Sequence, residues 1–223
     1  EKYMPPEQFT DRPKYLGWSP TNFPHWKVQD QIIPPWALSP EVASVQKFLD
    51  APTEELYKPI RERGYSASAA LEAMDAEGID IAVVFRTFAH MIVSIDDLPP
   101  QLAVACCSAF NDWLSDYCSA DSTRLKPSAI VSLHDPELAA AEAQRAVLKN
   151  NHVGVVLLPM PVNGRYINAA ECDVLWKEVE RLNVPILFHG TSGGASKDYS
   201  SNRFRDHPNF RTLNHSASFP MEL

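Results

Sequence analysis

Several features that would assign this sequence to a common class of protein are missing from it. No apolar run in the 223 residues approaches the roughly 18 to 20 residues of a membrane-spanning helix. Basic residues are also too few for a nucleic-acid surface, because 28 Asp and Glu outnumber 20 Lys and Arg and give a net charge of −8. We therefore expect neither a membrane nor a nucleic acid as a partner.

The sequence motifs of several chemistries are missing as well. The glycine-rich loops GxGxxG and GxxxxGK[ST], which bind dinucleotides and phosphates, do not occur, and neither does the GxSxG of serine hydrolases. The four cysteines include no CxxC pair, so they offer no zinc-ribbon spacing. Cys107 and Cys118 lie on one predicted helix, where cysteines pack as small apolar side chains. We expect a reducing, cytoplasmic setting without cysteine chemistry.

The first 65 residues are rich in proline and aromatic residues. They hold 10 of the 19 prolines and three of the five tryptophans. Proline fixes φ and removes a hydrogen-bond donor, so long regular elements are not expected. One short helix is predicted over residues 39–49, capped by Ser39 with Pro40 at its first position. Because the aromatic rings need burial, residues 1–65 are predicted to form an irregular arm packed on a body formed by residues 66–223.

From residue 66 onward, predicted helices alternate with short apolar strands. Helices are predicted at 66–77, 101–119, 136–150 and 169–182, and strands at 80–87, 126–133, 153–158 and 184–189. Apolar strands joined by helical crossovers are typical of a parallel sheet that is covered on both faces. The pattern leaves two architectures open, a doubly wound open sheet and a (β/α)₈ barrel.

Candidate functional side chains are sought at the carboxyl ends of these strands, where ligands bind in parallel α/β proteins. His189 ends the last predicted strand and precedes a loop that contains Gly190, Gly193 and Gly194. Glycines let a ligand approach the backbone closely, and a neutral imidazole is a common metal ligand. His189 is therefore a candidate metal ligand, the alternative being a histidine that is merely hydrogen-bonded at a strand end.

Four further residues are weaker candidates. Arg86 follows a strand and could clamp a substrate carboxylate or pair with a loop carboxylate. Arg165 could also bind substrate, or be a solvated loop charge. His134 could be a ligand, although Asp135 beside it better fits a helix cap. His215 could be an acid/base or an ordinary loop histidine.

Six segments, taken in order, resemble a known family. They are ALEAMDAEGIDIAVVF, FNDWLSDYC, LKPSAIVSLHDPELAAAE, VGVVLLPMPVNGR, LWKEVERLNVPILFHGTSGG and NHSASFPME. The series is similar to the amidohydrolase-related family, a group of metal-dependent TIM-barrel enzymes that includes the resorcylate-type decarboxylases. The resemblance covers roughly residues 65–223, and the opening EKYMPPEQF resembles the segment after that family's first strand.

The resemblance implies a (β/α)₈ barrel with a divalent metal, Zn or Mn, at the carboxyl ends of its strands. His189 matches the family's metal-ligand histidine. The other ligands of the family, a D/E-x-H motif on the first strand and an aspartate on the last, have no counterpart here. We therefore expect an incomplete barrel, from a chain truncated at both ends.

The resemblance also implies an enzyme acting on a small carboxylated substrate, aromatic or unsaturated. Arg86 and Arg165 are the expected substrate-binding residues and His215 the expected catalytic one. Metal-dependent hydrolysis is the main expectation, non-oxidative decarboxylation at the same metal is the alternative, and a truncated non-catalytic relative is the third. A homo-oligomer is also expected.

Overall fold

The parallel strands predicted from the sequence are present in the computed structural model. The structure describes residues 2–4, 10–18, 24–33, 58, 60, 62–85 and 89–190. Strand β4 (Ala82–Val84) pairs in parallel with β5 (Leu125–Pro127). Likewise, β6 (Ala129–Ile130) pairs with β7 (Val155–Leu157), and β7 pairs with β8 (Ile186–Phe188). The described part of the chain from residue 66 onward is therefore a parallel α/β structure.

Strands β5 and β6 are one extended segment that changes partner at Ser128. The backbone N–H and the hydroxyl of Ser128 both donate to the carbonyl of Val84, at 3.2 and 2.7 Å. Its neighbours turn to the other side, because the carbonyl of Pro127 accepts from Val153 and the N–H of Ala129 donates to Gly154. The strands consequently lie side by side in the order in which they occur in the chain.

Four helices connect and cover these strands, as the sequence predicts. They are α3 (Ala67–Glu77), α5 (Pro100–Cys118), α6 (Pro136–Asn150) and α7 (Asp173–Leu182). Asp135 caps α6 as expected, since its carboxylate accepts from the backbone N–H of Glu137 and of Leu138, at 2.9 and 3.1 Å. Helices α5, α6 and α7 lie on the same face of the strands, because Cys107, Ala143 and Leu175 share one core with the strand residues. The amide of Asn111 on α5 also donates directly to the carboxylate of Glu142 on α6.

The main core lies between the strands and these helices. Strand residues such as Ile130 and Leu157 pack there with Leu175 and Val179, which face inward from α7. All four cysteines are free and buried, as expected for small apolar side chains. Burial raises the pKa of Cys106 to about 12, so this thiol stays protonated.

The N-terminal region contains regular structure that the sequence analysis did not predict. Strands β1 (Lys14–Trp18), β2 (Pro24–Val28) and β3 (Gln31–Ile33) form a small antiparallel sheet. Its proline stands at the first position of β2, where a missing donor does little harm to the ladder. The helix predicted over residues 39–49 lies outside the described residues.

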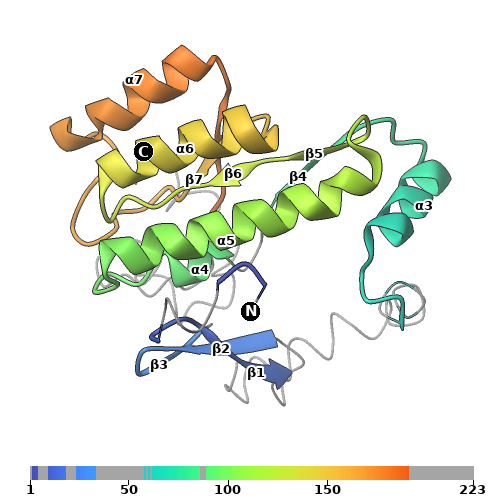
Figure 1. Ribbon diagram of the computed structural model, residues 1–223, viewed down its shortest axis with the longest axis horizontal. Coiled ribbons are helices and arrows are strands. Elements are labelled where there is room, and N and C mark those ends of the chain that lie inside the picture. Colours follow the sequence, from blue (N-terminus) through green and yellow to red (C-terminus); the bar gives the residue numbers. More distant parts are fainter. Residues whose placement is uncertain are drawn as a thin grey trace, which may run out of the picture.

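This N-terminal sheet packs on the side of α5 that faces away from the parallel strands (Figure 1). Val28 and Ile33 are buried there together with Ile92, Leu102 and Cys106. None of the helices that the structure describes is long and apolar enough to cross a bilayer.

Candidate metal site

His189 lies directly after β8, at the carboxyl end of the parallel strands. Its backbone N–H donates to the carbonyl of Leu157 at 3.1 Å, which extends the pairing of β8 with β7 by one bond. Its Nδ1 lies 2.8 Å from the carbonyl oxygen of Gly190. Because a carbonyl only accepts, Nδ1 carries the hydrogen, and in the neutral ring Nε2 presents the lone pair. A metal-binding histidine uses this same support, with one nitrogen donating and the other free to coordinate.

A second imidazole lies against the first. His90 belongs to the short helix α4 (Ala89–Ile92), which follows β4, and only 1% of its surface is exposed. The centroids of the His90 and His189 rings are 4.5 Å apart, with an angle of 38° between their planes. The ring of Phe85, just after β4, lies 6.0 Å from that of His189. His90 was not among the candidates from the sequence, where its one available signal was its place soon after a predicted strand.

The described residues supply only part of a metal site. Among residues 2–190 as far as the structure describes them, no three His, Cys, Asp or Glu side chains gather closely enough to hold an ion. A catalytic zinc generally takes three protein ligands. His189 thus has the donor atom, tautomer and strand-end position that a metal ligand needs, and its role as a ligand stays a prediction.

Arg165 holds the backbone at neighbouring strand ends. Its Nη1 donates to the carbonyls of Leu133 and His134, at 2.5 and 3.0 Å, and so links the loop after β7 to the loop after β6. The guanidinium is partly buried, which differs from a solvated loop charge. Its role in binding substrate stays a prediction.

His134 is fully engaged by its neighbours. Its Nε2 donates to the carbonyl of Ile95 at 2.7 Å, and its Nδ1 accepts from the hydroxyl of Ser132 at 2.6 Å. Burial lowers the pKa of His134, which keeps the ring neutral. With both ring nitrogens occupied, His134 presents no lone pair to a ligand, so the structure favours a structural role for it. Arg86 and His215 lie outside the described residues, and their roles stay predictions.

Comparison with known proteins places the chain in a family. Residues 54–218 match the amidohydrolase family model, Amidohydro_2, and the chain belongs to this family. The decarboxylase orsB of Emericella nidulans is 31% identical over 123 residues, which are 54% of this chain and 34% of that protein. A gamma-resorcylate decarboxylase of Rhizobium radiobacter is 29% identical over 124 residues, 53% of this chain and 37% of that protein. The chain thus spans little more than a third of the length of these curated relatives.

Solved structures of decarboxylases have a similar fold. The 2,6-dihydroxybenzoate decarboxylase from Rhizobium is 26% identical, with a TM-score of 0.55 over 69% of this chain and 46% of that chain. A dihydroxybenzoic acid decarboxylase from Polaromonas sp. JS666, with bound manganese and the inhibitor 2-nitroresorcinol, is 22% identical. Its TM-score is 0.57 over 69% of this chain and 45% of that chain, a likeness of fold alone.

Proposed function

We propose that this chain is part of a metal-dependent decarboxylase that acts on a small aromatic carboxylic acid and has His189 as one metal ligand. The observation that carries the proposal is the hydrogen bond from Nδ1 of His189 to the carbonyl of Gly190, which leaves the lone pair on Nε2 at the carboxyl end of β8. The reaction is proposed by analogy with the decarboxylases named above, which are similar to part of this chain.

A (β/α)₈ barrel is the fold that best accounts for the contact between Phe85 and His189. These residues follow β4 and β8, which are the first and fourth strands in the spatial order. Three strand spacings on a flat sheet would separate them by roughly 14 Å, yet their rings lie 6.0 Å apart. A sheet that curls toward closure brings such side chains together at one end of its interior.

The exposed side of β4 supports the same fold. Ile81, Val83 and Phe85 alternate along this segment and therefore share one face. They are 59%, 44% and 37% exposed, which is unusual for apolar residues of a parallel sheet. In a closed barrel this face points inward, where further strands and their side chains would cover it.

His189 would supply one of the ligands that a divalent ion such as manganese or zinc needs. His189 would bind it through Nε2, while Gly190 fixes the tautomer and the buried ring of His90 limits the rotation of the imidazole. When bound, such an ion supplies a positive charge that orients the substrate carboxylate and polarises the reacting group. Arg165 holds two strand-end loops in place beside this region.

Decarboxylation replaces hydrolysis, the main expectation from sequence, because the similar proteins are decarboxylases. In this reaction the bond between the ring carbon and the carboxylate carbon breaks, carbon dioxide leaves, and the electron pair stays on the ring. The ring carbon then takes a proton from an acid. His215 remains our candidate for that acid, with Arg86 and Arg165 as candidates for binding the substrate.

The test uses the protein encoded by the complete reading frame, loaded with manganese. We expect release of carbon dioxide from 2,6-dihydroxybenzoate, and no hydrolysis of the matching benzamide. His189→Ala should lower the rate by at least about 100-fold. Hydrolysis of the amide without any decarboxylation would refute the proposed reaction.

A further inference from the structure

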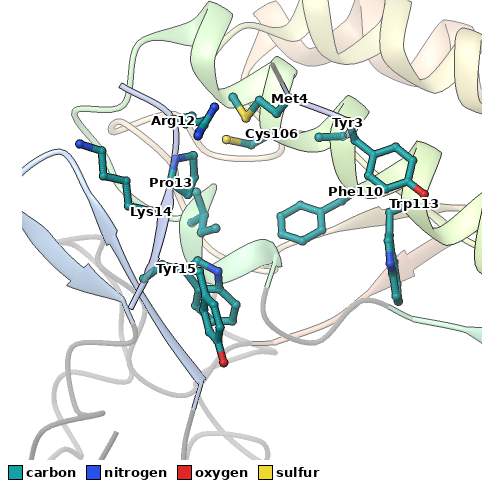
Figure 2. A pocket seen from close by; sticks show the side chains of 12 residues that line it. Tyr3, Met4, Arg12, Pro13, Lys14, Tyr15, Cys106, Phe110 and Trp113 are labelled. Atoms are coloured by element: carbon teal, nitrogen blue, oxygen red, sulfur yellow. The ribbon is translucent and has the colours of Figure 1, made fainter. Parts of the chain in front are cut away.

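A cavity of about 570 Å³ lies between the N-terminal sheet and α5, apart from His189. Its volume falls within the range of roughly 300 to 1,000 Å³ that is usual for small-molecule sites. The described residues that line it come from the N-terminal region, α4 and α5: Tyr3, Met4, Arg12, Pro13, Lys14, Tyr15, Trp26, Ile92, Cys106, Ala109, Phe110 and Trp113. Figure 2 shows nine of these side chains with labels.

Aromatic rings form much of the wall. Tyr3, Tyr15, Trp26, Phe110 and Trp113 all line the cavity, and the rings of Tyr15 and Trp26 pack against each other with centroids 5.7 Å apart. Aromatic walls favour a planar ring, because offset-stacked and edge-to-face contacts add to the burial of apolar surface. Met4, Ile92 and Cys106, which are buried, add further apolar surface to the lining.

The charged part of the lining is positive. Arg12 and Lys14 lie at one side of the cavity, and Tyr3 and Trp113 at the other, with Phe110 between them (Figure 2). Nη1 of Arg12 is fully buried. Among the lining residues that the structure describes, none is an aspartate or a glutamate. The described lining therefore offers two cations and no carboxylate to an anionic group that enters on this side.

Asp116 on α5 accepts a hydrogen bond from the lining residue Tyr3. Its carboxylate accepts from the hydroxyl of Tyr3 at 2.7 Å and from the ammonium of Lys2 at 2.6 Å. These two donors lower the pKa of Asp116, so its charge persists but is paired with Lys2. Asp116 thus holds Tyr3 in place at the wall while adding little net negative charge to the cavity.

We propose that this cavity is a second ligand site, which binds an aromatic carboxylate of one or two rings. The ring lies among the aromatic side chains, and the carboxylate lies at Arg12 and Lys14. The site is distinct from the candidate metal site because α4 separates the two: Ile92 faces the cavity, whereas His90 packs on His189. Binding here requires neither a metal nor His189, so the inference goes beyond the proposed decarboxylation.

Calorimetric titration of the protein with 2-naphthoate tests this inference, with neutral 2-naphthamide as the matched ligand. We expect saturable binding of the acid and at least about tenfold weaker binding of the amide, because the amide lacks the charge-assisted contact. Arg12→Gln and Lys14→Gln should each weaken binding of 2-naphthoate by about three- to tenfold. Lys177→Gln is the matched control, since it removes the same charge from an exposed position on α7, away from the cavity, and should change nothing.

Two further measurements keep the outcome clear. His189→Ala and removal of manganese should both leave the affinity for 2-naphthoate unchanged, which separates this site from the proposed metal site. Circular dichroism should show that the variants fold; if Arg12→Gln unfolds, the comparison of Lys14→Gln with Lys177→Gln decides, because both positions are exposed. Equal binding of acid and amide, absence of saturable binding, or loss of binding in His189→Ala would overturn the inference.

Discussion

The imidazole of His90 lies against that of His189, with ring centroids 4.5 Å apart, although 98 positions in the sequence separate the two residues. One ring is on α4 and is buried, and the other follows β8 and is half-buried. The buried ring of His90 restricts the rotation of the His189 ring, in addition to the bond between Nδ1 of His189 and the carbonyl of Gly190. Together the two contacts hold Nε2 in one direction, which is what a metal ligand requires.

Removing the His90 ring should therefore loosen the proposed metal site. We expect His90→Ala to weaken manganese binding by about 10-fold or more, in line with the loss of supporting contacts around a metal ligand. His90→Phe is the matched control, because it keeps an aromatic ring against His189 and should retain most of the affinity. Equilibrium dialysis with manganese measures both variants. Equal affinity of His90→Ala and the unaltered protein would show that the contact does not support the site.

A second prediction concerns Asn111, whose side chain joins α5 to β6 and α6. Its amide accepts from the N–H of Ile130 at 2.9 Å and donates to the carbonyl of Ile130 at 3.0 Å. It also donates to the carboxylate of Glu142 at 2.6 Å. Asn111→Leu leaves these buried groups without that partner, so the free energy of unfolding should fall by about 2 to 4 kcal/mol.

Urea unfolding measures the effect of Asn111→Leu, and Ser119→Ala is its control. Ser119 also forms a side-chain hydrogen bond at the end of α5, but the bond is exposed. Its loss should change the free energy of unfolding by no more than about 0.5 kcal/mol. Similar losses for both variants would contradict the view that burial makes the Asn111 contacts important.

A third prediction concerns the close approach of β7 and β8 at Gly154. A Cβ at this position would lie 2.9 Å from Cδ1 of Leu187 and 3.2 Å from the carbonyl oxygen of Pro185. Gly154→Ala should therefore lower the free energy of unfolding by about 1 to 3 kcal/mol. In a protein that already carries Leu187→Ala, Gly154→Ala should lower the free energy of unfolding by less, because the contact with Cδ1 of Leu187 is gone. Strict additivity of the two substitutions would argue against the packing described here.

The acid sensitivity of the fold should reflect two buried histidines. Burial lowers the pKa of His134 and of His152 below the ordinary value of 6.5. Below about pH 6.5 the unfolded chain takes up protons at these positions that the folded chain resists, so stability falls as the pH falls toward the lowered pKa values. Above about pH 6.5 these two positions take up few protons in either state, so they no longer lower the free energy of unfolding.

Urea unfolding of the metal-free protein at pH 7.5 and 5.5 tests this expectation. Exposed carboxylates titrate nearer pH 4, so they contribute little between these two values. We expect a lower midpoint at pH 5.5, and a smaller difference between the two pH values in a His134→Gln variant. A midpoint that does not change with pH would contradict the assignment of neutral, buried rings.

The helices and the parallel strands were predictable because their signals are local. Helical patterns in the sequence predicted α3 and α6 closely, and Asp135 was expected as the cap of α6. Strand-end position also predicted where His189 lies. These features depend on residues that are near one another in the sequence.

The contacts that the sequence did not predict depend on distant residues. The contact of His90 with His189 requires β4 and β8 to approach each other. No pattern among neighbouring residues in the sequence predicts this approach. The N-terminal sheet was missed because the prolines of that region argued against regular structure. Pro24, however, stands at the start of β2, where proline is tolerated.

The metal content of His189→Ala tests the central claim most directly. The complete protein and the variant would be purified in parallel, given manganese, dialysed, and analysed for metal by atomic emission, with circular dichroism to confirm that both fold. If His189 is a ligand through Nε2, the variant should lose most of its manganese while it keeps its secondary structure. Equal metal content in the two proteins would contradict the account and leave His189 as a structural residue at the end of β8.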